Sequence, residues 1–134
     1  MILIDAGPLI ALLHRDDRNH ERCLATLKSF REPVGTTWPV SSEAMHLLRF
    51  SWDAQDGLWD LIASNALRLF SLDVTDVQRM RQLMQKYRDL PMDLADAALV
   101  RIAERESISR IFTIDRRDFG VYRPAKVGRF QIIP

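Results

Sequence analysis

Met1-Ile-Leu-Ile-Asp5 and Ile111-Phe-Thr-Ile-Asp115 are two short, mainly apolar runs that each end on an aspartate. A continuous apolar run of this length is typical of a strand buried on both faces, as in a parallel sheet. Ligands of open α/β sheets bind beyond the carboxyl ends of the strands, where both aspartates would lie. Each aspartate also suits a turn or a helix cap, so the pattern alone leaves both roles open.

The chain between these two runs alternates strand-like and helix-like segments. Further strands are expected at 34–37, 67–72 and 130–133, the last at an edge of the sheet. Helices are expected at 9–13 after Pro8, from 17 or 19 to 30, from 41 or 42 to 50, at 53–66, from 75 or 76 to 87, and at 93–107. This alternation predicts an α/β fold, with a parallel sheet covered by helices on both faces.

The composition is that of one globular domain, expected to span residues 1–134. Hydrophobic residues make up 47% of the chain and charged residues 28%, which argues against disorder. The single cysteine, Cys23, lies in an apolar helical pattern and is expected to be a buried thiol rather than a reactive one. No charged leader precedes the first apolar run, and no run approaches the ~20 residues of a membrane span. We therefore expect a reduced, cytoplasmic protein.

Glu43 and Asp96 are acidic residues inside predicted helices. Glu43 lies near the start of its helix, where a carboxylate also favours the helix dipole. Asp96 lies among alanines and leucines, three residues after Asp93 and on roughly the same helix face. Two carboxylates on one face repel each other unless a cation or solvent lies between them. Asp93 suits the N-cap of this helix, which leaves Asp96 without a structural role.

Convergence of these acids would form a pocket lined by oxygen atoms alone. The residues concerned are Asp5, Glu43, Asp96 and Asp115. Mg²⁺ and Mn²⁺ prefer such oxygen ligands, and one or two of these ions can activate water for phosphodiester cleavage. Convergence in space is the step that the spacing leaves open.

Four segments of the chain resemble PIN-domain proteins, and specifically the VapC-type toxin ribonucleases of bacterial toxin–antitoxin pairs. They are Ile2-Leu-Ile-Asp5-Ala-Gly-Pro-Leu-Ile-Ala-Leu, Thr36-Thr-Trp-Pro-Val-Ser-Ser-Glu43-Ala, Pro91-Met-Asp-Leu-Ala-Asp96-Ala-Ala-Leu and Ile111-Phe-Thr-Ile-Asp115-Arg-Arg-Asp-Phe119. No single segment is specific, but all four in this order, in a chain of this length, are strongly specific. The resemblance covers the whole chain and implies a three-layer α/β/α sandwich around a mostly parallel sheet.

The resemblance also implies an activity, a cofactor and partners. It implies a Mg²⁺- or Mn²⁺-dependent endoribonuclease whose products carry a 3′-hydroxyl and a 5′-phosphate. The implied partners are an RNA substrate, a small antitoxin that inserts a segment near the acids, and a second copy of the chain in a homodimer, with no membrane involved.

Carried over residue by residue, the resemblance makes the catalytic and metal-holding acids Asp5, Glu43, Asp96 and Asp115. Asp93 becomes a secondary ligand or orienting group. Thr113 matches a hydroxyl position that orients the acids or water, although it is also an ordinary β-branched strand residue. Asp118 competes with Asp115 for the fourth place, but the neighbouring arginines favour a solvent-facing turn for Asp118.

Two other classes of function remain open from the sequence. One is a PIN-fold RNA-binding or regulatory partner with weak or no nuclease activity. Its groove would use apolar residues that helical spacing more readily places in the core, namely Leu48, Phe50, Trp52 and Trp59. The other is phosphotransfer on Asp5, which Gly7 disfavours because haloacid-type phosphatases have a second aspartate there. The three histidines lack the spacing of a metal site or a catalytic pair.

The formal net charge of +1 conceals an uneven distribution along the chain. Residues 1–100 carry 11 Lys and Arg against 14 Asp and Glu, a net charge of −3, whereas residues 101–134 carry 8 against 4, a net charge of +4. We expect the basic C-terminal third to hold RNA phosphates near the metal. The candidates are Arg110, Arg116, Arg117, Arg123, Lys126 and Arg129.

Overall fold

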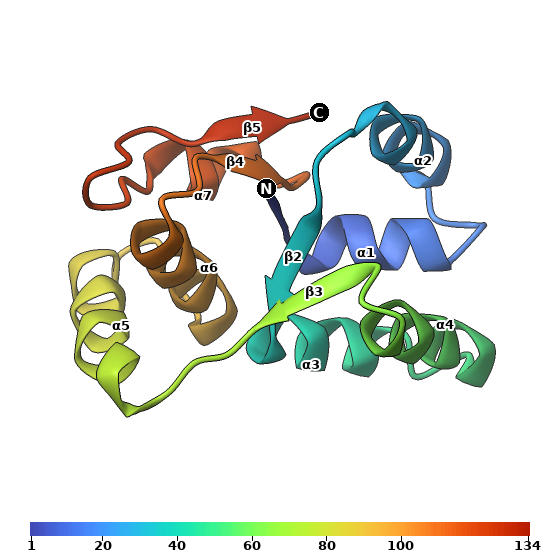
Figure 1. Ribbon diagram of the computed structural model, residues 1–134, viewed down its shortest axis with the longest axis horizontal. Helices are drawn as coiled ribbons and strands as arrows, with labels where there is room; N and C mark the ends of the chain where they lie inside the picture. The colour runs from blue at the N-terminus through green and yellow to red at the C-terminus, as the bar shows by residue number, and fades with distance from the viewer.

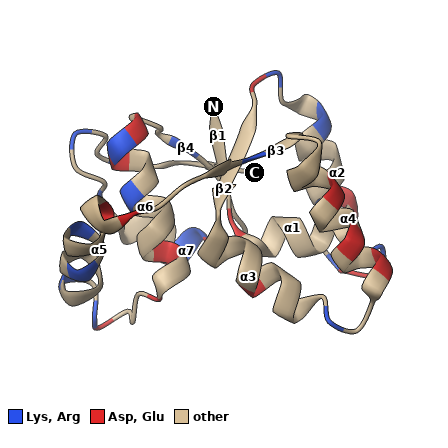
Figure 2. Ribbon diagram, turned by 60° about the horizontal axis from the view of Figure 1, so that its bottom comes forward, with Lys and Arg blue, Asp and Glu red and all other residues tan.

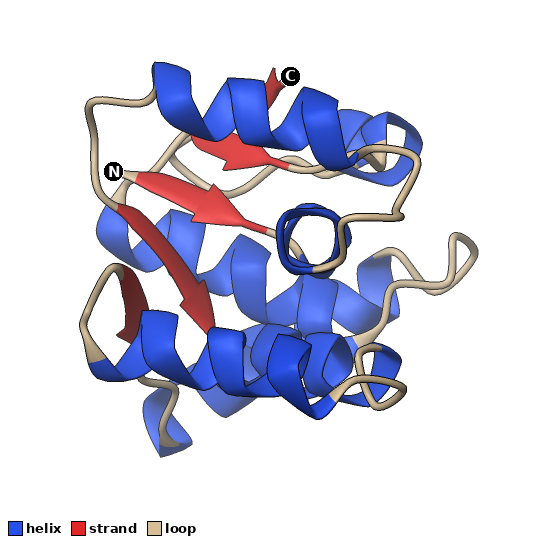
Figure 3. Ribbon diagram, turned by 90° about the vertical axis from the view of Figure 1, so that its right-hand side faces the viewer, coloured by secondary structure: helices blue, strands red, loops and turns tan.

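A parallel sheet of five strands forms the centre of the computed structural model, which describes residues 1–134 (Figure 1). The strands are β1 (Ile2–Ile4), β2 (Val34–Thr37), β3 (Leu67–Phe70), β4 (Arg110–Phe112) and β5 (Gln131–Ile133). Their order across the sheet is β3-β2-β1-β4-β5, and every neighbouring pair is parallel. The arrows of the sheet run the same way in Figure 3, so the carboxyl ends of the strands share one edge.

Helices cover both faces of this sheet. They are α1 (Ala6–Leu13), α2 (His20–Ser29), α3 (Trp38–Leu47), α4 (Trp52–Ala63), α5 (Val74–Lys86), α6 (Leu94–Glu106) and α7 (Arg116–Val121). Figure 1 shows α5 and α6 on one side of the sheet and α1, α2 and α4 on the other. The expected three-layer α/β/α architecture is confirmed, with β5 at an edge as the sequence predicted.

The strand order reverses direction at β1. From β1 the chain builds outward through β2 and β3, and it then returns to place β4 and β5 on the opposite side of β1. Such a reversal separates the loops that follow two neighbouring strands, and it is where ligands of open α/β sheets bind. The loops after β1 and β4 flank this point, and they carry Asp5 and Asp115.

A single cluster of 28 buried residues fills the space between sheet and helices. The Cys23 side chain is fully buried in it, which confirms the expectation of a structural thiol. Gly35 in β2 allows the Phe70 ring to lie against the strand, because a Cβ atom at this position would come within 2.6 Å of the ring. Close packing of this kind leaves little freedom for the strands that carry the acidic loops.

Four helices begin earlier than the sequence pattern predicts: α1 at Ala6, α3 at Trp38, α4 at Trp52 and α5 at Val74. Helix α3 follows directly on Thr37 rather than starting at Ser41 or Ser42, and Pro39 lies in its first turn, where the missing N–H costs no hydrogen bond. Helix α5 is capped by Asp73, not by Thr75 or Asp76. The Asp73 side chain accepts a hydrogen bond from the Thr75 N–H, and the Asp76 side chain accepts one from the Asp73 N–H.

Helix α7 is a second departure from the prediction, which placed a solvent-facing turn at residues 116–119. The Asp115 side chain caps this helix, and the Phe119 side chain on it is fully buried. Helix α5 also buries an acid that the sequence pattern did not indicate. Val77 and Met84 are exposed, whereas Asp76 is completely buried. A buried acid on a polar helix is invisible to hydrophobic periodicity, since its partners lie elsewhere in the sequence.

The aromatic residues around α4 are mostly on the surface. Leu48 is fully buried, as a core interpretation requires, but Phe50, Trp52 and Trp59 are 60%, 63% and 45% exposed. The core prediction is therefore wrong for these three aromatic residues. No helix of the structure is both long and apolar enough to cross a membrane.

Candidate active site

Asp5 and Asp115 are joined through a single hydroxyl group. The Thr113 hydroxyl donates to Asp5 Oδ2 at 2.8 Å and accepts a hydrogen bond from the Asp115 N–H at 3.0 Å. The other carboxylate oxygen of Asp5 accepts from the Ala6 N–H at 2.8 Å, which makes Asp5 the N-cap of α1. The cap interpretation and the site interpretation are thus compatible, because one carboxylate oxygen serves each.

The backbone brings these two loops into contact. The Asp5 N–H extends the sheet by donating to the Phe112 carbonyl at 3.0 Å. Gly7, in the first turn of α1, packs so closely on Ile114 that a Cβ atom would lie 2.9 Å from that side chain. A larger residue at position 7 would push α1 away from the β4 loop and separate Asp5 from Asp115.

Asp96 is held by a buried tyrosine that the sequence analysis did not identify. The Tyr122 hydroxyl donates to Asp96 Oδ2 at 2.7 Å, and the Tyr122 ring is fully buried between Tyr87 and Phe119, with ring centroids 5.0 and 5.2 Å away. Burial raises the pKa of Tyr122 well above its usual value, and the hydrogen bond to Asp96 raises it further. The hydroxyl therefore stays protonated and acts as a fixed donor. The sequence offered no signal for it, because Tyr122 follows a helix that was not predicted.

The pKa values of Asp96 and Asp5 are both raised in the folded protein. Burial raises the pKa of Asp96 to about 7; the hydrogen bond from Tyr122 opposes the shift, and the charges of Asp5, Asp93 and Asp115 add to it. Burial likewise raises the pKa of Asp5, partly offset by the Thr113 and Ala6 hydrogen bonds and reinforced by Asp115 and Asp93. These couplings place four of the predicted acidic residues in one electrostatic cluster.

Glu43 joins the same cluster from α3. Its half-buried carboxyl has a raised pKa because of burial and then because of the charges of Asp93 and Asp5. Asp93 is exposed and caps α6 through a hydrogen bond from the Asp96 N–H at 2.8 Å. Figure 2 shows acidic positions on α3 and α7 with the start of α1 between them.

Asp118 also lies beside the cluster. Burial and the charge of Asp115 raise its pKa, and its N–H donates to Asp115 Oδ1 at 3.0 Å. Asp115 is linked to Asp5 through Thr113 whereas Asp118 is not, which favours Asp115 as the fourth acid. Its assignment stays a prediction, as do those of the other site residues.

No Lys, Arg or His side chain forms an ion pair with any of these acids. This is unusual, because buried carboxylates are normally paired with cations or coordinate metals. No three His, Cys, Asp or Glu side chains stand close enough to one another to form a ready-made metal site. The donor set is nonetheless composed only of oxygen atoms, which suits a hard divalent cation that retains several of its waters.

The expected basic rim is less available than the sequence suggests. Arg110 pairs with Glu32, Arg116 donates to the Pro134 carbonyl, and Arg123 donates to the carbonyls of Gly120 and Tyr122. Exposed cations that make no such bond remain at Arg117, Lys126 and Arg129.

Comparison with known proteins gives the chain a family. Residues 2–124 match the model of the PIN domain. The chain is 28% identical over 135 residues to a protein named Ribonuclease VapC26 from Mycobacterium tuberculosis, and the match covers 99% of this chain and 100% of that relative.

Solved structures share the fold at low sequence identity. The VapC20 toxin of Mycobacterium tuberculosis, described as cleaving the sarcin–ricin loop, matches with a TM-score of 0.80 and 16% identity over 87% of this chain and 92% of that one. A toxin–antitoxin complex from Klebsiella pneumoniae matches with a TM-score of 0.70 and 15% identity over 100% of this chain and 97% of that one. With the family model covering nearly the whole sheet and all the acids, the chain belongs to the PIN-domain family, as its four sequence segments predicted.

Proposed function

We propose that the chain, acting as one PIN domain over residues 1–134, is a metal-dependent endoribonuclease and the toxin of a toxin–antitoxin pair. The observation that carries the proposal is the cluster of acids at the point where the strand order reverses. These acids have no cationic partner, and burial together with neighbouring acids raises the pKa values of Asp5, Glu43 and Asp96. Membership of the PIN-domain family and the similarity to a protein named as a VapC ribonuclease support it.

The residues proposed to hold Mg²⁺ or Mn²⁺ are Asp5, Glu43, Asp96 and Asp115, with Asp93 as a secondary group. Their mutual repulsion is the physical reason for a cation to bind, since a divalent ion removes the unfavourable energy of like charges in a partly buried site. When bound, such an ion would lower the pKa of a coordinated water and offset charge on the phosphate being cleaved.

The side chains around the acids fix their orientation. Thr113 orients Asp5 through the 2.8 Å hydrogen bond, and it also fixes the start of the loop that carries Asp115. Tyr122 fixes one oxygen of Asp96 and leaves the other free. Asp96 and Asp115 thus each have one carboxylate oxygen that accepts a hydrogen bond from the protein and one that is available, an arrangement typical of supported metal ligands.

A protein partner is part of the proposal. Phe50, Trp52 and Trp59 are exposed aromatic side chains on or next to α4, and exposed apolar groups can mark interaction sites. The structural match to a toxin–antitoxin complex supports an antitoxin as this partner. The homodimer expected from the resemblance stays a prediction.

The test is RNA cleavage by the purified chain under controlled metal. We expect cleavage of a mixed RNA pool in Mg²⁺ or Mn²⁺, none in EDTA, and at least a ~100-fold loss in Asp96→Asn. Asp60→Asn, at an exposed position on α4, removes the same charge far from the acids and should cleave normally. Full activity in EDTA or in Asp96→Asn would reject the proposal. RNA binding without cleavage under every metal condition would favour the RNA-binding or regulatory alternative.

A further inference from the structure

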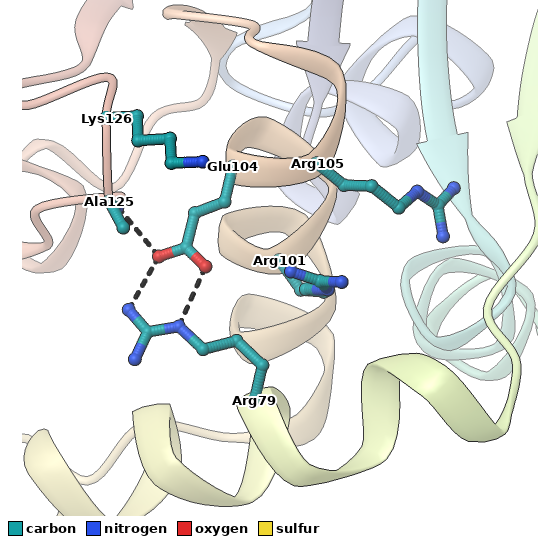
Figure 4. Close-up of a pocket in the computed structure, with 6 residues that line it drawn as sticks. All are labelled: Arg79, Arg101, Glu104, Arg105, Ala125 and Lys126. Carbon is teal, nitrogen blue, oxygen red and sulfur yellow. Dashed lines mark hydrogen bonds and ion pairs between the residues drawn. The ribbon is translucent and has the colours of Figure 1, made fainter.

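A second charged pocket lies between α5, α6 and the loop at residues 123–128, and the acidic cluster contributes no residue to it. Its volume is about 400 Å³, and its lining is mostly cationic: Arg79, Arg101, Glu104, Arg105, Ala125 and Lys126 (Figure 4). Four cationic residues and one carboxylate thus line the pocket. None of the acids assigned to cleavage lines this pocket, so the proposed cleavage site does not account for it.

Two buried carboxylates, Asp76 and Glu104, form ion pairs with the arginines that line the pocket. Asp76 is completely buried and pairs with Arg101 Nε at 2.7 Å and with Arg105 Nη1 at 2.9 Å. Glu104 accepts two hydrogen bonds from Arg79, at 2.8 and 2.7 Å. Arginines fixed in this way lose little conformational freedom when a ligand binds, which favours recognition of an anion.

These ion pairs leave some of the nitrogen donors around the pocket without a protein partner. Arg101 uses only Nε, so both of its terminal nitrogens remain without a protein partner, and Lys126 Nζ makes no hydrogen bond or ion pair. Arg105 is less available, because it also faces Glu106 at 3.5 Å and lies near Asp73. The free donors therefore come mainly from Arg101 and Lys126, one on α6 and one on the loop.

The loop is built so that Lys126 stays over the pocket. The Ala125 N–H donates to Glu104 Oε2 at 2.8 Å, and Lys126 itself has a φ of 67°, in the left-handed region. Lysine rarely adopts this conformation, and a local cost of this kind is often retained at functional positions. Figure 4 shows Lys126 extending from the loop towards Glu104, whereas Arg105 points away from it.

We propose that this pocket binds a phosphate of the RNA backbone away from the scissile bond. The chemistry fits, since a phosphodiester takes hydrogen bonds from the fork of an arginine and a point charge from a lysine. Asp96 lies in the first turn of α6 and Arg105 near its last residue, a separation of roughly 13 Å along the helix axis at 1.5 Å per residue. Only an RNA of several nucleotides could reach both. The inference rests on the proposed function in that it takes RNA as the substrate.

The test is RNA binding without cleavage. Binding of a fluorescent single-stranded RNA of about 20 nucleotides is measured by anisotropy in EDTA across a salt series. Lys126→Asn removes the charge with a residue that tolerates positive φ, so the loop should keep its shape. We expect about fivefold weaker binding at 0.1 M salt and a slope of log K against log salt smaller by about 0.7, the value for one released counterion on a single strand.

Lys28→Asn is the matched control, since Lys28 is exposed on α2, on the opposite side of the sheet, and should bind RNA as the wild type does. Arg101→Lys keeps the charge beside Asp76 but loses the fork, and it should weaken binding while remaining folded. Equal affinity and salt slope for Lys126→Asn and Lys28→Asn would overturn the phosphate site, as would absence of RNA binding by the wild type.

These experiments distinguish failure of the phosphate site from failure of the proposed nuclease function. If the wild type cleaves RNA in Mn²⁺ but Lys126→Asn binds as tightly as Lys28→Asn, only the phosphate site is wrong. If Lys126→Asn shows the expected loss of binding but no metal supports cleavage by the wild type, only the nuclease proposal is wrong.

Discussion

Asp76 and Asp96 are two partly or fully buried aspartates in neighbouring helices, yet their surroundings shift their pKa values in opposite directions. Burial alone would raise the pKa of Asp76, but the Asp73 N–H, Arg101 and Arg105 more than offset that and hold it below its usual value. Burial raises the pKa of Asp96 to about 7, and the neighbouring charges, which are all acidic, add to that shift.

We interpret this difference as that between a structural carboxylate, Asp76, and a proposed functional one, Asp96. Asp76 is satisfied by its own chain, so it contributes to stability and has no capacity left for a ligand. Asp96 keeps one oxygen unpaired in the company of other acids, where we propose that a divalent cation from outside the chain supplies the positive charge. This contrast is the physical basis for placing the metal at the acidic end of α6 and a phosphate at its basic end.

The largest effect expected from the contrast is on activity. Asp5→Asn should reduce RNA cleavage at least ~100-fold, because it removes a charge from the proposed metal site, while its amide oxygen can still accept the hydrogen bond from the Ala6 N–H. Asp76→Asn, assayed below its unfolding temperature, should cleave within a few-fold of the wild type. Comparable losses in the two variants would mean that the acids of the two regions are not distinct in role.

The next effect is on the free energy of unfolding, and here Asp76→Asn is the more damaging of the two variants. Asp76→Asn leaves Arg101 and Arg105 without their buried carboxylate, and we expect the free energy of unfolding to fall by about 3 kcal/mol. Urea denaturation followed by circular dichroism measures it. Asp60→Asn, on the surface of α4, should change stability by less than ~0.5 kcal/mol. A small effect at Asp76 would show that the buried pair is not a structural element.

A smaller effect is expected on the pH dependence of stability in the metal-free protein. The pKa of Asp96 is about 7 in the folded state and near 3.9 in the unfolded state, so between these values the folded state binds more protons. Stability from this group therefore falls as pH rises from about 4 to 7. Asp96→Asn lacks that loss, so it should melt several degrees above the wild type at pH 8 and no higher than the wild type at pH 5. Equal differences at both pH values would contradict the assigned pKa shift.

The smallest effect tests the tyrosine. Tyr122→Phe removes the hydrogen bond that lowers the pKa of Asp96, so that pKa should rise. The pH midpoint of Mn²⁺ binding should move upward by less than about one unit, because Mn²⁺ competes with the proton. Tyr87→Phe removes a hydroxyl from the adjacent ring. That hydroxyl accepts a hydrogen bond from the Arg123 N–H and does not contact Asp96, so this variant should leave the pH midpoint of Mn²⁺ binding unchanged. An equal shift in both variants would assign the effect to packing.

The sequence predicted those features that depend on local pattern. The apolar runs located the strands of the sheet, and the acids at the ends of β1 and β4 indicated the site before any coordinates, since strand ends of a parallel sheet share an edge. The prediction that Asp93 caps its helix was also confirmed. Family, fold and the grouping of the acids could therefore be anticipated from residues 1–134 alone.

Features that depend on distant partners could not be anticipated. Asp76 on α5 is satisfied by arginines 25 and 29 residues away, so its burial leaves no trace in local hydrophobicity. Tyr122 reaches Asp96 from 26 residues further along the chain. The basic C-terminal third was identified from charge alone, but the pairing of Arg110 with Glu32 shows that charge counts do not reveal which cations remain free.

The central claim is that a divalent cation binds among the unpaired acids. It is tested most directly by the anomalous difference map of a crystal soaked in Mn²⁺. The account predicts a peak among Asp5, Glu43, Asp96 and Asp115 and none beside Asp76 or Glu104, whose charges are already matched by arginine. No peak at the acidic cluster under saturating Mn²⁺, or a peak beside Asp76 instead, would contradict it.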